Sequence, residues 1–269
     1  KSFLMDLTKK NKYLSLFGFK FERGGAHTSR TMMLEDLRVL LSYVARPDAE
    51  KDSYLHAITD ENCLGKRSAK TRILTYRHLV ELYSLDKNNV LFRTLLYFWY
   101  RDVDGQPLLA MLCVYARDTI FQSSAQFILK FTEGAVIQRE SLEDYIDAQE
   151  PGRFSKATLK STAQNINSTW TKSGHLQGRA QKVRSCAHAT AGSVAYALFL
   201  GYLTGVRGNL LFQTEYIKIL DCSCTKAVEL AEEASCKGWI NVKRVGDVIE
   251  VLFPNLIKQE EMERLCEQN

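Results

Sequence analysis

The residues best able to do chemistry in this sequence are cations that share one stretch of chain with no carboxylate. From Pro151 to Thr214 there is no aspartate or glutamate, while eight lysines and arginines fall inside it: Arg153, Lys156, Lys160, Lys172, Arg179, Lys182, Arg184 and Arg207. The formal net charge is +5, from 36 Lys and Arg against 31 Asp and Glu, so this stretch supplies the whole positive excess. One sign of charge on one segment is typical of a surface that meets a polyanion, most often nucleic acid.

Phosphate binding is the specific chemistry that the start of this stretch predicts. Lys156 and Lys160 are one helical turn apart, so both project from one helix face. Arg153 precedes them, and Ser155 and Thr158 add hydroxyl groups. A helix amino end that presents amides, hydroxyls and cations suits phosphate oxygens. The alternative is an ordinary solvated helix face, although such a face usually carries charges of both signs.

Two further basic clusters extend this prediction. A loop or small wing that could neutralise phosphates without reading bases carries Arg179, Lys182 and Arg184. Its alternative is a flexible surface loop. A second cluster at a helix start, which is either another phosphate contact or a plain exposed helix start, contains Lys66, Arg67 and Lys70. This second cluster is not a P-loop, because Asp60 stands where a glycine is required and Arg67 follows the lysine.

The sequence gives little support for catalysis or metal binding. The five histidines lack a His-Glu-x-x-His spacing, and neither Gly-x-Ser-x-Gly nor Gly-x-Gly-x-x-Gly occurs. A metal site at Cys186, His188 and His175 lacks a Cys-x-x-Cys pair. We therefore predict a protein that is not an enzyme and uses no metal or other cofactor. An unrecognised enzyme that requires an added metal or nucleotide is the alternative.

Cysteine usage and apolar run lengths bear on the cellular compartment. The seven cysteines are odd in number and irregular in spacing, so we predict that they are reduced and mostly buried, as in a cytoplasmic protein. The longest apolar runs are 108–116 and 194–203, well short of the roughly 18 to 20 residues that span a bilayer. The sequence therefore predicts no membrane partner.

The elements that must position the cations are mostly helices. Four prolines and fifteen glycines leave few helix breakers, which favours helices joined by short loops. We predict a mainly α fold, with a helical N-terminal bundle followed by winged-helix-like C-terminal units and a small β-hairpin. Residues 1–135 form the N-terminal domain, including a basic and aromatic arm over the first 25 residues. Residues 136–269 form the C-terminal region, with a basic helix-turn-helix over 141–186 and a second helical unit with a hairpin over 193–257.

Local signals place the individual elements. A helix that begins at Pro107 and runs to about Phe131 is apolar nearly all round over Leu108–Tyr115, which predicts the centre of the bundle. Ser155 is placed to cap the basic helix. Apolar and polar residues alternate over 240–253, which indicates a β-hairpin. The helix before this hairpin carries Glu229, Glu232 and Glu233, so we assign the second unit to structure or protein contact rather than to DNA.

Several stretches together resemble the BrxA family of bacterial BREX phage-defence systems, as a distant relative. The stretches are Phe21-Glu22-Arg23-Gly24-Gly25-Ala26, 66–72, 154–162 and 170–176. The resemblance covers about residues 20–180, and the region after Ala187 extends beyond it. It implies an all-helical accessory protein with a winged-helix portion that binds double-stranded DNA and acts beside other defence-system proteins. The family implies no catalytic residues.

Residues and resemblance together predict a non-enzymatic protein that binds double-stranded DNA mainly through phosphate contacts. The alternative is a protein-interaction scaffold of a defence complex, in which the basic segment meets an acidic protein partner.

Overall fold

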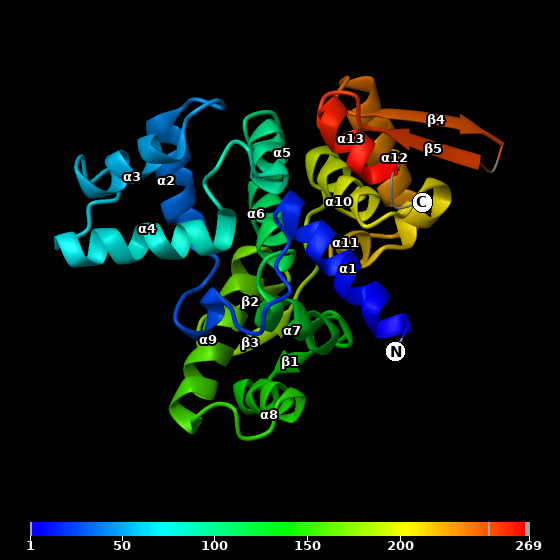
Figure 1. The fold of residues 1–269 in the computed structure, drawn as a ribbon. Helices are drawn as coiled ribbons and strands as arrows, with labels where there is room; N and C mark the ends of the chain where they lie inside the picture. Colours follow the sequence, from blue (N-terminus) through cyan, green and yellow to red (C-terminus); the bar gives the residue numbers. More distant parts are fainter. Residues whose placement is uncertain (1, 247, 267–269) are drawn as a thin grey trace.

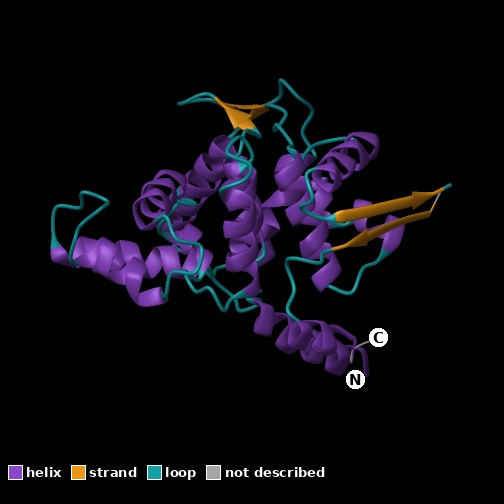
Figure 2. Ribbon diagram, turned by 90° about the horizontal axis from the view of Figure 1, so that it is seen from above, coloured by secondary structure: helices purple, strands orange, loops and turns teal. Residues whose placement is uncertain are grey.

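The computed structural model describes residues 2–246 and 248–266 and confirms a mainly helical fold (Figure 1). Two small antiparallel sheets lie at different edges of the molecule (Figure 2). The helices, with 3-10 helices written η, are α1 (Ser2–Phe17), η1 (Ala26–Thr28), α2 (Leu34–Val44), α3 (Lys51–Thr59), α4 (Ala69–Tyr83), α5 (Val90–Trp99), α6 (Gln106–Tyr115), α7 (Thr119–Leu129), α8 (Arg139–Gln149), α9 (Lys156–Lys172), α10 (Ala191–Leu203), η2 (Gly208–Gln213), α11 (Glu215–Lys218), α12 (Cys224–Cys236) and α13 (Gln259–Cys266). The strands are β1 (Val136–Ile137), β2 (Leu176–Gln177), β3 (Lys182–Arg184), β4 (Asn241–Val245) and β5 (Val248–Leu252).

The N-terminal segment differs from the predicted arm. Residues 2–17 form the helix α1 rather than an arm or irregular strand. Its last turn buries Leu14 and Phe17, and the Tyr13 ring packs edge-on against Phe17 with 5.0 Å between ring centroids. Lys9, Lys10 and Lys12 separate the apolar residues near the start of this helix from those of its last turn, so the sequence shows poor helical periodicity.

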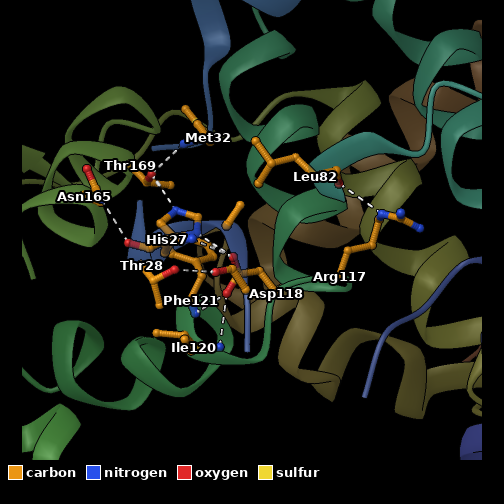
Figure 3. Close-up of polar contacts among 12 residues, drawn as sticks. His27, Thr28, Met32, Leu82, Arg117, Asp118, Ile120, Phe121, Asn165 and Thr169 are labelled. Carbon is orange, nitrogen blue, oxygen red and sulfur yellow. Dashed lines mark hydrogen bonds and ion pairs between the residues drawn. The ribbon is translucent and has the colours of Figure 1, made fainter. Parts of the chain in front are cut away.

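The prediction of a single helix from Pro107 to about Phe131 is wrong, because the helix is interrupted at Arg117 and Asp118. α6 ends at Tyr115 and α7 begins at Thr119. The Asp118 carboxylate accepts hydrogen bonds from the backbone N–H groups of Ile120 (3.1 Å) and Phe121 (2.9 Å), and so caps α7. Buried Arg117 donates to the Leu82 carbonyl at 3.1 Å, which holds the break against α4 (Figure 3).

The core is centred on α5, α6 and α10, which pack against one another. Every residue of α10 is buried, and α10 packs against α5, α6, α11 and α12. Helix α6 is buried from Leu108 to Tyr115, as its apolar composition predicts, and packs against α4, α5, α7 and α10. The buried apolar cluster is therefore continuous from the first helices to the last hairpin. The domain boundary predicted at residue 135 stays a prediction.

Most of the acid-free stretch belongs to one unit of three helices and a three-stranded sheet. Helix α7 packs against α8, and α8 packs against α9. Strand β3 is central: Val136 of β1 lies opposite Val183, and Leu176 of β2 lies opposite Arg184. The order from α7 to β3 is helix, strand, helix, helix and hairpin. The range 141–186, for which the sequence predicts a helix-turn-helix, covers most of α8 and all of α9, β2 and β3. Helix α7 is the first helix of this unit and lies before that range.

The second unit ends in the predicted hairpin. Strands β4 and β5 pair in register from Asn241 opposite Leu252 to Val245 opposite Val248. Alternate residues Ile249 and Val251 are buried, which accounts for the period of two in the sequence. Within the described residues, no helix is both long enough and apolar enough to cross a membrane.

Candidate nucleic-acid interface

The amino end of α9 is fixed by a serine cap. Ser155 Oγ accepts a hydrogen bond from the Thr158 backbone N–H at 3.2 Å, and the two side-chain hydroxyls lie 2.9 Å apart. Gly152 precedes the cap with a φ of 74°, a left-handed conformation that glycine adopts at little cost. Ser155 and Thr158, which the sequence predicts to contact phosphate, hold the start of the helix in the structure.

One face of α9 is exposed and carries the two lysines. Lys156, Lys160 and Gln164 are exposed on successive turns, while Ile166 and Trp170, nearer the carboxyl end of the helix, are buried. The helix sequence contains no acidic residue. This face therefore presents two ammonium groups and a carboxamide to solvent, which are groups that bind phosphate oxygens and base edges.

Arg153 lies beside this face, but its charge is already paired. Its Nη1 atom lies 2.8 Å from each carboxylate oxygen of Glu150. Its guanidinium carbon also lies 4.7 Å from the centroid of the Phe154 ring. A phosphate that bound Arg153 would have to compete with Glu150.

The hairpin of β2 and β3 carries Arg179 at an exposed turn. Gly178 shapes this turn, because a Cβ atom there would lie 2.1 Å from the Gln181 carbonyl oxygen. Lys182 is half-buried and donates to the Gly178 carbonyl at 2.6 Å, and burial lowers the pKa of its ammonium group. The hairpin therefore offers one exposed cation and one that is held at its base.

The assignment of Arg184 to this surface is wrong. Only 5% of Arg184 is exposed, and its guanidinium forms two hydrogen bonds to the Asp221 carboxylate, at 2.7 and 2.8 Å. Burial raises the pKa of the Asp221 carboxyl, but the hydrogen bonds and charge of Arg184 outweigh burial and hold it below its usual value. Arg184 therefore joins the sheet to the segment before α12, and solvent phosphate cannot reach it.

Lys172 lies on a different face of α9, which segment 26–32 covers. Lys172 Nζ lies 3.3 Å from Thr31 Oγ1, and Asn165 Nδ2 donates to the His27 carbonyl at 3.0 Å. The structure therefore separates Lys172 from the exposed face that carries Lys156 and Lys160.

The cluster at Lys66, Arg67 and Lys70 belongs to the start of α4. Lys66 Nζ lies 2.7 Å from an Asp36 carboxylate oxygen, whereas Arg67 and Lys70 are exposed. In Figure 1, α4 begins at the left edge of the molecule and α9 begins near the bottom. The structure does not bring this cluster together with the exposed face of α9.

A buried polar network that sequence reasoning missed fixes α9 against the N-terminal segment (Figure 3). His27 Nδ1 lies 2.8 Å from Asp118 Oδ2, and His27 Nε2 lies 2.8 Å from Thr169 Oγ1. Thr169 Oγ1 also accepts the Met32 backbone N–H at 2.9 Å, and the His27 ring stacks on Phe121. The one feature of the sequence that could have indicated part of this network is Asp118, an aspartate directly before the residues of α7, where a helix cap is expected.

The order Asp118, His27, Thr169 has the form of an activated nucleophile, but its burial points to a positioning role. His27 and Thr169 are fully buried and Asp118 is 2% exposed. Burial alone raises the pKa of the Asp118 carboxyl, but the charge and hydrogen bonds of His27 outweigh it and hold the pKa below its usual value. The network therefore joins η1, α7 and α9 through one ionised carboxylate.

Metal binding finds no support in the part of the chain that the structure describes, where no group of three or more His, Cys, Asp or Glu residues could hold an ion. Both ring nitrogens of His175 have protein partners: Ser173 Oγ lies 2.9 Å from Nδ1, and the Ile219 carbonyl lies 2.8 Å from Nε2. Burial lowers the pKa of His175 to about 4. This histidine is therefore a neutral core residue.

The prediction that the cysteines are mostly buried is wrong. Among the cysteine side chains that the structure describes, one is buried, Cys113. Two are half-buried, Cys63 and Cys222, and three are exposed, Cys186, Cys224 and Cys236. The side chain of Cys266 lies outside the description. Cys224 and Cys236 occupy the two ends of α12, where residues face solvent more than in the middle of a packed helix.

The exposed face of α9 meets the cations of the hairpin at Gln164. Gln164, one turn beyond Lys160, lines a groove together with Arg179 and Lys182. No protein-family model and no curated protein matches this chain.

Proposed function

We propose that this protein binds double-stranded DNA, without catalysing a reaction, through α9 and the β2–β3 hairpin. The observation that carries the proposal is the exposed face of α9, which presents Lys156, Lys160 and Gln164 and lacks any acidic side chain. Helix α9 would lie in the major groove, with the hairpin against the adjacent backbone. The order helix, strand, helix, helix and hairpin supports this proposal, because it is that of a winged helix.

Phosphate contacts would supply most of the affinity. The exposed cations Lys156, Lys160 and Arg179 are available for such contacts, with Lys182 as a fourth at the base of the hairpin. Four neutralised phosphates give a slope of log affinity against log salt of about −3.6, so affinity falls roughly 100-fold between 50 and 200 mM salt. Arg153 and Lys172 are secondary candidates, because the Glu150 carboxylate pairs with Arg153 and because Lys172 lies on the face of α9 that segment 26–32 covers.

The test is fluorescence anisotropy of a labelled random-sequence 20-bp duplex at the two salt concentrations. The double substitution Lys156→Glu and Lys160→Glu is expected to abolish binding, because it reverses both charges on the exposed face. The matched control is Lys226→Glu with Lys237→Glu on α12, which changes the net charge equally but lies on the acidic second unit.

Absence of duplex binding at 50 mM salt by the folded wild-type protein would overturn the proposal. The scaffold alternative, in which the basic face meets an acidic protein, would then be tested by crosslinking. Equal loss in both double variants would show a non-specific charge effect and would also count against α9 as the interface.

The cellular role rests on the resemblance to the BrxA family. It supports a place in a bacterial phage-defence assembly, in the cytoplasm, with other defence-system proteins as partners. Deletion of the gene from a host that carries such a system should lower resistance to phage, and unchanged resistance would argue against this role.

A further inference from the structure

A groove of about 690 Å³ lies between the amino end of α8, the middle of α9 and the turn of the β2–β3 hairpin. Its volume is in the range of sites for small ligands. The polar side chains that matter for its chemistry are Arg139, Glu140, Asn167, Arg179 and Lys182.

Asn167 is the unusual member of this set. The residue is only 4% exposed, and its Oδ1 atom is buried without a hydrogen-bond partner among the described residues. A buried polar group left unpaired lowers stability, so such groups normally find partners within the protein. The two ends of a carboxamide exchange by rotation, so this side chain can turn either a donor or an acceptor toward a ligand.

The amino end of α8 contributes donors to the same groove. Gln138 precedes this 11-residue helix, and its side chain makes no cap hydrogen bond in the described structure. The N–H groups of the first helical turn are therefore not satisfied by a side chain, and the helix dipole favours an anion there. Gln138 and Arg139 both line the groove.

Charge in the groove also favours an anion. Three cations line it against the single carboxylate of Glu140. Arg139 is already paired, with Glu140 and at 2.7 Å with Glu143, which leaves Arg179 and Lys182 as the cations that can turn to a ligand. An anion with several acceptor oxygens would match these cations, the amide of Asn167 and the first turn of α8.

We propose that this groove binds a phosphate group. The phosphate comes either from the backbone of bound DNA, in which case the inference rests on the proposed function, or from a free phosphate ester. Gln164 is exposed on the face that carries Lys156 and Lys160 and also lines the groove. A duplex on that face would therefore bring its backbone over the groove.

The test uses the full chain and the substitutions Asn167→Leu and Arg179→Gln. We expect Asn167→Leu to raise the melting temperature, because it removes an unpaired buried amide, and to weaken binding of the 20-bp duplex about tenfold. Arg179→Gln, on the exposed turn, should weaken binding similarly without a change in melting temperature. Lys226→Gln on α12 is the control and should change neither quantity.

Titration with inorganic phosphate and with methyl phosphate tests the free-ligand source by ¹H–¹⁵N NMR. The amide signals of Glu140 and Ser141 and the side-chain amide of Asn167 should shift in the wild-type protein and not in Arg179→Gln.

The outcomes separate the two proposals. Duplex binding that Asn167→Leu retains at full strength, without phosphate-induced shifts, overturns the groove and leaves the proposed function standing. Phosphate-induced shifts in a protein that binds no duplex overturn the proposed function and assign the groove to a free phosphate ester. If the protein neither binds the duplex nor shows phosphate-induced shifts, the groove and the proposed function are both overturned.

Discussion

A single buried imidazole, that of His27, connects three segments that are distant in the sequence. It bonds to Asp118 and Thr169, which are 91 and 142 residues away along the chain. Asn165 of α9 also bonds to the His27 carbonyl. The position of the basic helix therefore depends on a residue far from the basic stretch.

Replacement of this imidazole should be costly. His27→Ala would leave the ionised Asp118 buried with fewer hydrogen bonds, so we expect the free energy of unfolding to fall by about 3 kcal/mol. Urea denaturation measures this change. His56→Ala is the control, since His56 is 62% exposed and should change stability by less than about 0.5 kcal/mol. Equal effects of the two substitutions would contradict a positioning role for His27.

His175 predicts how stability depends on pH. Its pKa in the folded protein is lowered to about 4 by burial, below an unfolded value of about 6.5. Between these values the unfolded chain binds a proton that the folded protein does not, so acidification favours unfolding. Stability should be constant above about pH 6.5 and decline below it, by about 3 kcal/mol at pH 4.

Denaturant titrations at several pH values check this prediction. His175→Gln keeps an amide donor for the Ile219 carbonyl and should reduce the decline between pH 6.5 and 4. An unchanged slope in this variant would assign the pH dependence to other groups.

Two helices of the protein begin in the same way, which offers a matched comparison at the scale of the element. Ser68 caps α4 and Ser155 caps α9, each by accepting from the N–H three residues later, at 3.1 and 3.2 Å. In both, a threonine hydroxyl lies 2.9 Å from the serine Oγ. Basic residues accompany both caps.

Substitution of each serine should cost similar stability but have different effects on DNA binding. Ser68→Ala and Ser155→Ala are each expected to lower the free energy of unfolding by about 1 kcal/mol. Only Ser155→Ala should weaken duplex binding, because α9 is the proposed recognition helix. Thermal denaturation and anisotropy measure the two effects. Weaker binding with Ser68→Ala would instead place α4 in the interface.

The break between α6 and α7 shows how side chains can end one helix and begin another where the apolar pattern continues. Apolar composition continues across Arg117 and Asp118, and it alone predicts one long helix. The Asp118 carboxylate accepts from two N–H groups of α7, and Arg117 turns to carbonyls of neighbouring segments. These bonds compensate the helical hydrogen bonds that the break removes.

At the scale of the molecule, one ion pair joins the basic unit to the second unit. Arg184 follows the hairpin turn and Asp221 precedes α12, and their side chains meet as a bidentate pair. The two residues are 37 positions apart in the sequence, so only the folded chain brings their side chains together.

Removal of one partner of this pair should be worse than removal of both. Asp221→Leu leaves a buried guanidinium unpaired, and we expect a loss of about 3 kcal/mol. The double variant with Arg184→Met should recover most of that loss, because no buried charge remains. A double-mutant cycle measured by denaturation gives the coupling. Additive effects would show that the pair does not join the two units energetically.

The sequence by itself determined the mainly helical composition, the final hairpin, the serine cap of α9 and the absence of carboxylates on α9. Each of these depends on residues within a few positions of one another, as in a period of two over 240–253 or a cap three residues from its partner. The local sequence is therefore enough to predict such features.

Only the tertiary structure decided which cations remain available and where the helices break. Arg184, Lys66 and His27 each have a partner at least 30 residues away, at Asp221, Asp36 and Asp118. The sequence contains these side chains but does not show which pairs meet, because the packing of distant segments brings the partners together. Burial then makes the difference between a paired charge inside the protein and a cation that can bind phosphate.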